Sequence, residues 1–127
     1  AVTTGSDNTA VGDNALGANT TASNNTAVGS AALLVNTTGA RNTAIGDGAL
    51  TANTTGDNNV AIGRGTLDAN TTADANTAVG QAALGANTTG ASNTAVGRAA
   101  LLYHRNRKRS CWHGCIRCNR SGNRRLL

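Results

Sequence analysis

Hydrophobic and polar residues alternate in short stretches that return at a constant interval along most of this chain. The pentapeptide N-T-A-V-G and its close variants start at Asn8 and return every seventeen residues without insertion. Successive residues lie on opposite faces of an extended strand, so Thr9 would share a face with Val11, and Ala10 with Gly12. The apolar residues do not follow the helical spacing of three and four, and Gly, Asn and Thr are poor helix formers. The pattern therefore predicts a short strand in each block.

The repeated block also keeps Asn, Val or Ile, and Leu at three fixed positions. These recurring positions are Asn8, Asn25, Asn42, Asn59, Asn76 and Asn93; Val11, Val28, Ile45, Ile62, Val79 and Val96; and Leu16, Leu33, Leu50, Leu67, Leu84 and Leu101. A fixed period of this kind is typical of stacked units that bury a continuous core between neighbours. We predict an all-β fold, a parallel β-solenoid of seventeen-residue coils over residues 1–102, with coils starting near the six Asn.

The same alternation suggests which side chains point inward. Val60 stands where the other blocks carry Thr, so we expect the Thr and Val face to point into the coil, together with the recurring Leu. The Ala and Gly face would then be free for lateral association between chains. Stacked Asn side chains can bond amide to amide at the strand spacing of about 4.8 Å and can cap turns, so Asn ladders are expected. This architectural role competes with a reading of the recurring N-T-T as N-glycosylation sites.

Composition argues against an ordinary globular domain. Phe, Met and Pro are absent and the chain has 16 Gly, so a coil of this kind has few large side chains to bury and needs more coils, caps or lateral association. The chain begins inside the repeat pattern, and we interpret it as a piece of a longer protein in which no secretory, membrane-spanning or lipidation motif is visible. The net charge of +5 hides a division, because residues 1–102 carry three Arg and six Asp, while eight basic residues follow them.

The motifs N-V-A-I-G at 59–63, N-T-A-V-G and N-T-A-I-G, each followed by A-L or T-L, resemble the YadA-like head repeats of trimeric autotransporter adhesins. Similar repeats occur in some phage tail fibres. The resemblance covers about residues 1–102 and implies a left-handed parallel β-roll, a homotrimer, and attachment to a host surface or extracellular-matrix ligand. It also implies a secreted protein at the bacterial cell surface and outer membrane, or a fibre of a phage virion. The usual repeat is shorter than this one, so we expect an additional turn in each coil.

Residues 103–127 form a basic, Cys-containing tail with a different composition. Cys111, Cys115 and Cys118 have the C-x3-C-x2-C spacing that holds an iron–sulfur cluster in radical S-adenosylmethionine enzymes, but the large barrel domain of such enzymes is missing. The three Cys with His104 or His113 are a weak candidate for zinc. A nucleic-acid-binding arm, with four basic residues on phosphates, is a further alternative, and it depends on the tail being written in its proper reading frame. Those four residues are Arg105, Arg107, Lys108 and Arg109.

A shifted reading frame explains the tail better than any of these sites. If its codons are read one base later, residues 103–106 can encode T-T-G, and residues 108–113 can encode N-V-A-V-G, which closely matches residues 59–63. We therefore interpret the tail as the next repeat in a shifted frame. If the polypeptide is made as written, we expect it to be disordered or poorly packed from about residue 103, with reactive thiols.

The repeats contain no His, Cys, Glu or Lys, and their Asp residues do not form one uniform column. We therefore expect no enzyme, no cofactor, no metal site and no small-molecule substrate, and nucleic-acid binding only through the tail. The leading hypothesis is a structural module for surface display and adhesion. The alternative is an ice-binding β-solenoid, in which two columns of Thr would order water. These columns are Thr9, Thr26, Thr43, Thr77 and Thr94, and Thr20, Thr37, Thr54, Thr71 and Thr88.

Overall fold

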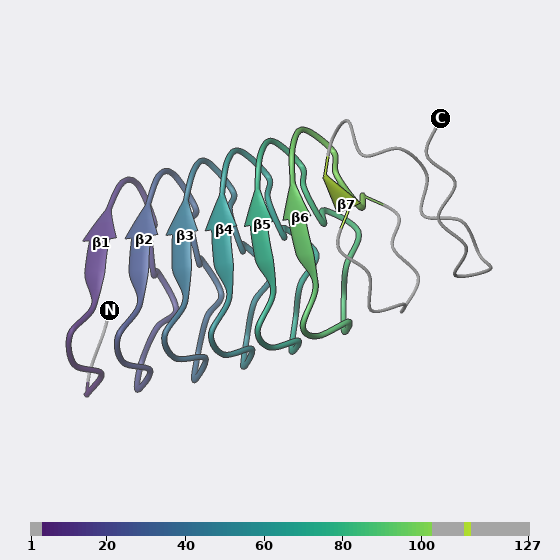
Figure 1. The fold of residues 1–127 in the computed structure, drawn as a ribbon. Helices are drawn as coiled ribbons and strands as arrows, with labels where there is room; N and C mark the ends of the chain where they lie inside the picture. The colour runs from purple at the N-terminus through teal and green to yellow at the C-terminus, as the bar shows by residue number, and fades with distance from the viewer. Residues whose placement is uncertain (1–3, 103–110, 113–127) are drawn as a thin grey trace, which may run out of the picture.

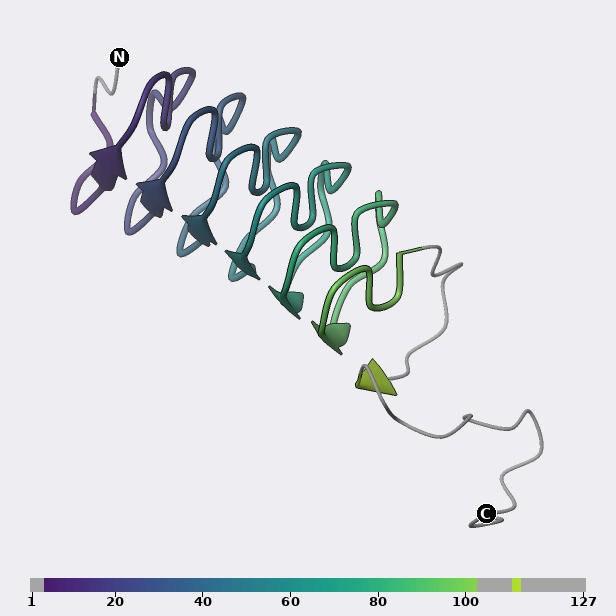
Figure 2. The ribbon, with the colours of Figure 1, turned by 90° about the horizontal axis from the view of Figure 1, so that it is seen from above.

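The computed structural model of this chain describes residues 4–102 and 111–112. Each seventeen-residue block forms one coil, and successive coils stack along one axis with their strands side by side (Figures 1 and 2). The strands are β1 (Thr9–Val11), β2 (Thr26–Val28), β3 (Thr43–Ile45), β4 (Val60–Ile62), β5 (Thr77–Val79), β6 (Thr94–Val96) and β7 (Cys111–Trp112). They form one sheet in the order β1 to β7. The predicted all-β parallel solenoid is confirmed.

The strands pair in parallel with a constant register from β1 to β6. Thr26 lies opposite Thr43, Ala44 opposite Ala61, and Ile45 opposite Ile62. Each residue therefore has its own equivalent, seventeen positions away, as its neighbour in the next strand. Because the period never changes, like residues stack in columns along the whole solenoid, as the sequence predicted.

The prediction of which strand face points inward is wrong. The central Ala of the strands is fully buried, with 0% exposure at Ala27, Ala44, Ala61, Ala78 and Ala95. Ile45 and Ile62, in contrast, remain 38% and 37% exposed. The face that we expected to be free for lateral association is thus the core, and the Thr and Val or Ile side chains lie outside. The methyl groups of these Ala residues pack in one hydrophobic core with the recurring Leu.

The prediction that the recurring Leu residues are buried is confirmed. Leu33, Leu50, Leu67 and Leu84 have 0% exposure and form one continuous core with the buried Ala residues. All six recurring Leu adopt a left-handed backbone conformation, with φ between 50° and 52°. This conformation is costly for a residue with a side chain, by roughly 1–2 kcal/mol, and here it turns each Leu into the coil. Burial of the side chain offsets that cost.

A second corner of every coil requires glycine. Gly46, which follows β3, has φ of +137°, a value that L side chains rarely adopt. A Cβ on Gly46 would lie 2.5 Å from the backbone oxygen of Gly63 in the next coil. The recurring Gly therefore allows two backbones to approach closely where the chain leaves the strand.

Two columns of buried Asn hold the coils together. The first Asn ladder is Asn8, Asn25, Asn42, Asn59, Asn76 and Asn93, and the second Asn ladder is Asn19, Asn36, Asn53, Asn70 and Asn87. In the first ladder, the backbone N–H of Asn59 donates to Oδ1 of Asn42 at 2.9 Å. In the second, Nδ2 of Asn53 donates to Oδ1 of Asn36, also at 2.9 Å. The predicted Asn ladders are confirmed.

The two ladders also share acceptors. The carbonyl oxygen of Gly56 accepts a hydrogen bond from Nδ2 of Asn42 at 2.8 Å and another from Nδ2 of Asn53 at 3.0 Å. Both lone pairs of that carbonyl are then used, which a buried carbonyl requires for full satisfaction. The same arrangement recurs at Ala22, Gly39 and Ala73. This network explains why the chain returns through N-T-T in each coil.

The C-terminal end of the sheet departs from the repeat. Strand β7 pairs in parallel with β6, with Ala95 opposite Cys111 and Val96 opposite Trp112. This step spans sixteen residues where the others span seventeen. Only Cys111–Trp112 of residues 103–127 are described, as β7. The expectation of a disordered or poorly packed tail stays a prediction for the others, which lie outside the described residues. The shifted reading frame stays a prediction.

Candidate functional surface

The outer face of the sheet is the most regular surface of the solenoid. It carries one column of Thr, interrupted by Val60, and one column of Val and Ile; we call these two columns the outer sheet face. Val11 is 58% exposed at the open end, and the equivalent residues in the next five strands are partly exposed. A parallel sheet is ordinarily covered on both faces. This uncovered face is therefore a candidate surface for association.

A second surface follows the strands, at the corner where the chain leaves the sheet. One exposed residue of each coil lies there, two positions after the strand, along the upper bends in Figure 1. We call this column the ridge: Asp13, Ser30, Asp47, Arg64, Gln81 and Arg98. The ridge contains two acids in its first half and two bases in its second half.

The only ion pair within residues 4–102 lies at the centre of the ridge. Nε of Arg64 is 3.4 Å from Oδ2 of Asp47, and the two side chains are 74% and 60% exposed. An exposed pair of this kind contributes roughly 0–1 kcal/mol, so it adds little to folding stability. The ion pair does show that side chains of neighbouring ridge residues are close enough to contact one another.

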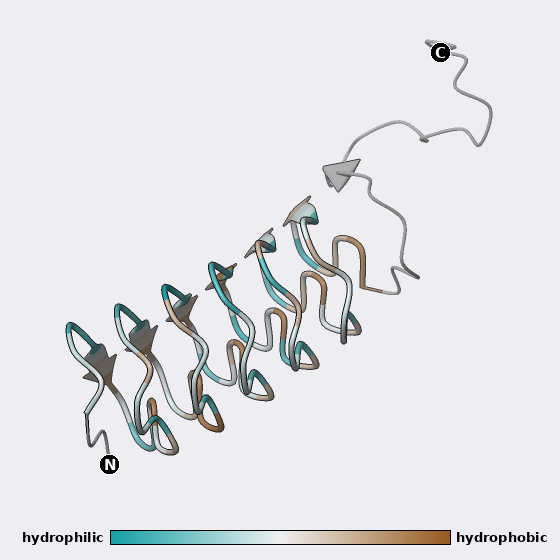
Figure 3. Cartoon of the chain, turned by 90° about the horizontal axis from the view of Figure 1, so that it is seen from below, coloured by the Kyte–Doolittle hydropathy of each residue, from teal (hydrophilic) through white to brown (hydrophobic). Residues whose placement is uncertain are grey.

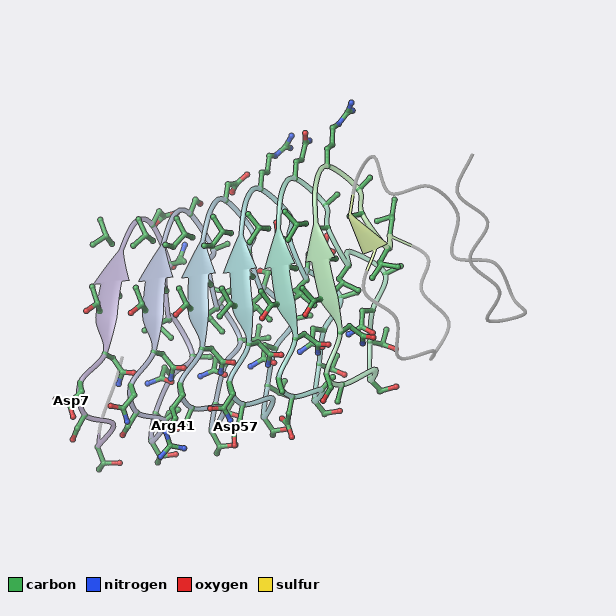
Figure 4. All side chains as sticks on the ribbon, viewed as in Figure 1. Asp7, Arg41 and Asp57 are labelled. Carbon is green, nitrogen blue, oxygen red and sulfur yellow. The ribbon has the colours of Figure 1, made fainter. Side chains whose placement is uncertain are left out.

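The opposite corner of the coils carries charge in a different order. Asp7, Arg41 and Asp57 lie along the lower corner in Figure 4, before the strands begin. Oδ1 of Asp57 accepts the backbone N–H of Ala40 at 2.7 Å, and Oδ1 of Asp74 accepts that of Asp57 at 2.8 Å. These carboxylates cap the backbone of the preceding coil, so they have a structural role here.

The N-T-T turns do not present free Asn side chains. The five Asn of the second ladder have 0–2% exposure and are hydrogen-bonded, which is incompatible with glycosylation of the folded coil. The following Thr is also engaged: Oγ1 of Thr37 donates to the backbone oxygen of Thr54 at 3.1 Å, and Thr54 repeats this contact with Thr71. The structural reading of N-T-T is thus supported by its contacts.

Asp68 is a carboxylate with a displaced pKa. Burial against its neighbours raises the pKa of Asp68, and hydrogen bonds from the backbone of Asp68 and Ala69 partly oppose that rise. Equivalent positions in other coils carry Gly17, Leu34 and Thr51. Asp68 therefore places a charge at a position that the fold does not require to be charged.

The metal candidates of the tail are not brought together within the described residues. Only the backbone of Cys111 is described, in β7, while Cys115 and Cys118 lie outside the described residues. Residues 4–102 and 111–112 contain no group of three or more His, Cys, Asp or Glu that could hold a metal ion. The weak metal assignment thus stays untested.

Comparison with known proteins yields no relative: no family model, no curated protein and no solved structure matches the chain. Within the described part of the chain, no helix is long and apolar enough to cross a membrane. The resemblance to YadA-like repeats therefore stays an expectation from the repeated motif. The candidate surfaces must be judged by their own geometry.

Sequence reasoning treated the recurring Asn, Val, Ile and Leu as structural positions, and the constant register brings each set into a column. Figure 3 shows the accompanying repetition of hydrophilic and hydrophobic stretches from coil to coil. Sequence reasoning placed the six ridge residues at one equivalent position of the block, but it used them only to argue against a uniform Asp column and did not consider them as a surface. The signal was present in the sequence, since the ridge is one residue in each block, but its members differ in type. Only the stacking of coils makes six unlike residues into one surface.

Proposed function

We propose that this chain is a structural module for surface display and attachment, forming part of an adhesin head or of a fibre. The observation that supports this most is the outer sheet face, where two columns of side chains repeat in register along five strand pairs. A surface of that kind presents the same contact many times, which favours multivalent binding to an extended partner. Its bacterial-surface or phage-fibre location is part of the same proposal.

The proposal includes a homotrimer associated through the outer sheet face. Val11, Ile45 and Ile62 are among the most exposed large hydrophobic residues of the described chain, at 58%, 38% and 37%. Removing apolar area from water stabilises an assembly by about 25 cal/mol per Å². Three copies side by side would cover this face, as the resemblance to trimeric adhesins implies.

Substitution on the outer sheet face tests the assembly. Ile45→Thr with Ile62→Thr keeps side chains that suit strands but removes apolar surface, so the trimer should weaken. Sedimentation of the full chain over a concentration series would measure the change. Val35→Thr is the matched control, because Val35 is also 38% exposed but lies outside the strands. A parent chain that sediments as a monomer at all concentrations would contradict the homotrimer.

Attachment itself is tested with beads that carry the full chain. We expect retention on extracellular-matrix protein or on host cells, and weaker retention when the outer sheet face carries the two Thr substitutions. Retention that is absent on both substrates would remove the adhesion proposal. Retention that is equal for parent and double variant would move the binding site to another surface.

Ice binding is the second candidate, and one observation favours it more than the sequence did. The Thr column of the sheet lies on the outside of the coil, as Thr26 and Thr43 do in adjacent strands, whereas we expected it inside. Against it, Val60 interrupts that column, and the Thr37 and Thr54 hydroxyls of the N-T-T column are bonded to backbone. Thermal hysteresis of the purified chain distinguishes the candidates, since only ice binding predicts it.

A further inference from the structure

We propose that the ridge is a docking surface for a second copy of this chain, aligned antiparallel to the first. The inference deepens the proposed attachment function by naming one partner. It rests on that function in one respect: the solenoids must be displayed where two copies can meet. The ridge lies beyond the C-terminal ends of the strands, so a partner there leaves the outer sheet face free.

The charge order of the ridge is self-complementary only when the second copy is reversed. From the first coil to the sixth, the residues are acidic, neutral, acidic, basic, neutral and basic. In an antiparallel pair, the first coil meets the sixth, the second meets the fifth, and the third meets the fourth. Asp13 then faces Arg98, Ser30 faces Gln81, and Asp47 faces Arg64. A two-fold axis repeats every contact, as an isologous interface requires.

The backbone keeps the ridge in a fixed register. The carbonyl oxygens of Asp13, Asp47 and Arg64 each accept an N–H from the following coil at 2.9, 2.9 and 3.0 Å. Successive ridge residues are thus separated by one coil, a spacing of about 4.8 Å between neighbouring strands. Because both copies share this spacing, one pair in register places all pairs in register.

The charges at the two ends of the ridge are available for a partner. Within residues 4–102, the single ion pair joins Asp47 and Arg64, so Asp13 and Arg98 form none there. Oδ2 of Asp13 accepts a hydrogen bond from Nδ2 of its neighbour Asn14 at 3.0 Å, which leaves the charge of Asp13 without a cation. At the centre, the two-fold axis would place two Asp47–Arg64 pairs together, with opposite charges as neighbours.

Other arrangements of two copies use these charges less well. In a parallel pair without stagger, each charge meets its own kind, which is destabilising. In a parallel pair shifted by three coils, Asp13 faces Arg64 and Asp47 faces Arg98, but half of each ridge stays unpaired. The opposite corner is less well matched. Reversal sets Asp7 against Ser92 and Arg41 against Asn58, and the carboxylates of Asp57 and Asp74 there already accept backbone N–H groups of the preceding coil.

A full charge exchange provides a test with its own specificity. The quadruple variant Asp13→Arg, Asp47→Arg, Arg64→Asp and Arg98→Asp keeps the net charge of the chain at +5. Beads of two colours carry the parent or the variant as full chains, all attached through the same terminus, so that solenoids on two facing beads can meet only antiparallel. We expect parent beads to cluster with parent, and variant with variant, while mixed clusters are rare. Free co-clustering of the two colours overturns the proposal.

Salt and stoichiometry complete the test. We expect self-association to weaken by about tenfold between 10 mM and 500 mM NaCl, because exposed pairs are screened at high salt; association that is insensitive to salt overturns the proposal. In sedimentation of the Ile45→Thr, Ile62→Thr variant, at concentrations where it is a monomer with a single ridge, the closed antiparallel pair doubles the mass and stops there. Continued growth with concentration identifies the staggered parallel pair and overturns it too.

Two further variants keep the proposal falsifiable if the quadruple variant does not fold, as circular dichroism would show. Asp13→Arg with Asp47→Arg should not self-associate, nor should Arg64→Asp with Arg98→Asp, but a mixture of the two should. Failure of the mixture to associate overturns the proposal. Asp7→Arg with Arg41→Asp is the charge-neutral control away from the ridge and should behave as the parent, since the two residues occupy the same position of the block with the same φ of 57°. A ridge that fails these tests leaves retention on matrix or cells, and the trimer, unaffected.

Discussion

The Asn ladders and the ridge are columns of the same solenoid, but the residue type is constant in the ladders and varies in the ridge. The first Asn ladder has the same residue in all six coils, and its members from Asn25 to Asn93 are at least 97% buried. The ridge has four residue types in six coils, and all are exposed. Inside, each coil imposes the same hydrogen-bonding demand on the next, so no other residue serves as well. Outside, stacking fixes only the position, and the choice of side chain is free to encode a partner.

The largest expected effect is at the glycine corner, where each coil again requires the same residue. Gly46→Ala should destabilise the solenoid by about 3 kcal/mol or more, since its φ suits glycine and the added Cβ would meet backbone that cannot move aside. Thermal or urea unfolding followed by circular dichroism would measure the loss.

Gly48→Ala is the control for that substitution. Gly48 also has a positive φ, +66°, but a Cβ there would have no atom within 4 Å. Left-handed conformation alone costs roughly 1–2 kcal/mol, and Ala31 and Ala82 already occupy the equivalent position. Equal losses for the two variants would show that the close approach of coils at Gly46 is unimportant.

A somewhat smaller effect is expected in the first Asn ladder. Asn59→Ala removes donors to Asn42 and Ala73 and leaves the backbone N–H of Asn76 without its acceptor. A buried polar group left unpaired costs about 1–3 kcal/mol, and we expect a loss of about 2–3 kcal/mol in urea unfolding.

Asn58→Ala sharpens the comparison, because Asn58 is the exposed neighbour of Asn59. Ala75 already stands at its equivalent position with a similar φ, so we expect a change below about 1 kcal/mol. A loss as large as that of Asn59→Ala would mean that the hydrogen bonds of the first Asn ladder are not the reason why its positions require Asn.

The smallest expected effect concerns Asp68, an exposed residue whose carboxyl group is nevertheless partly desolvated. Burial raises its pKa in the folded chain, so the folded state binds the proton more readily than the unfolded state does. Ionisation of Asp68 therefore lowers stability as pH rises through the raised pKa, and protonation restores it on acidification.

Asp68→Asn should accordingly be slightly more stable than the parent at pH 7, and the difference should vanish below the ordinary Asp pKa. Denaturation midpoints at several pH values would measure it. Asp7→Asn controls for the loss of one negative charge, at a position where Asn24 and Asn58 already stand in other coils. A difference that does not depend on pH would show that the charge of Asp68 has no part in it.

Much of the fold could be predicted because the same residue types recur at a constant interval. The constant interval between Asn25, Asn42 and Asn59 predicted parallel strands in register, and the register is as expected. The Asn ladders and the buried Leu followed from the same spacing. The β7 step could not be predicted, because Cys111–Trp112 carries no repeat residues and pairs one residue early.

Which face of the strand points into the core could not be predicted from the sequence. Alternation in T-A-V-G defines two faces, but it is symmetrical and does not say which face is inside. Val60 suggested the Thr and Val face, whereas the buried Ala44 and Ala61 occupy the core. The candidate surfaces changed with it, since the face expected to be free is covered and the outer sheet face is open.

The sequence by itself determined the period, the parallel register, the two Asn ladders and the aliphatic core, because each depends only on which residues recur at seventeen. Tertiary structure decided the inner face of the strand, because that depends on the width left between the strand and the Leu of the opposite wall. It also decided that Asp13 and Arg98 belong to one ridge, since residues 85 positions apart share a surface only after every coil between them has closed.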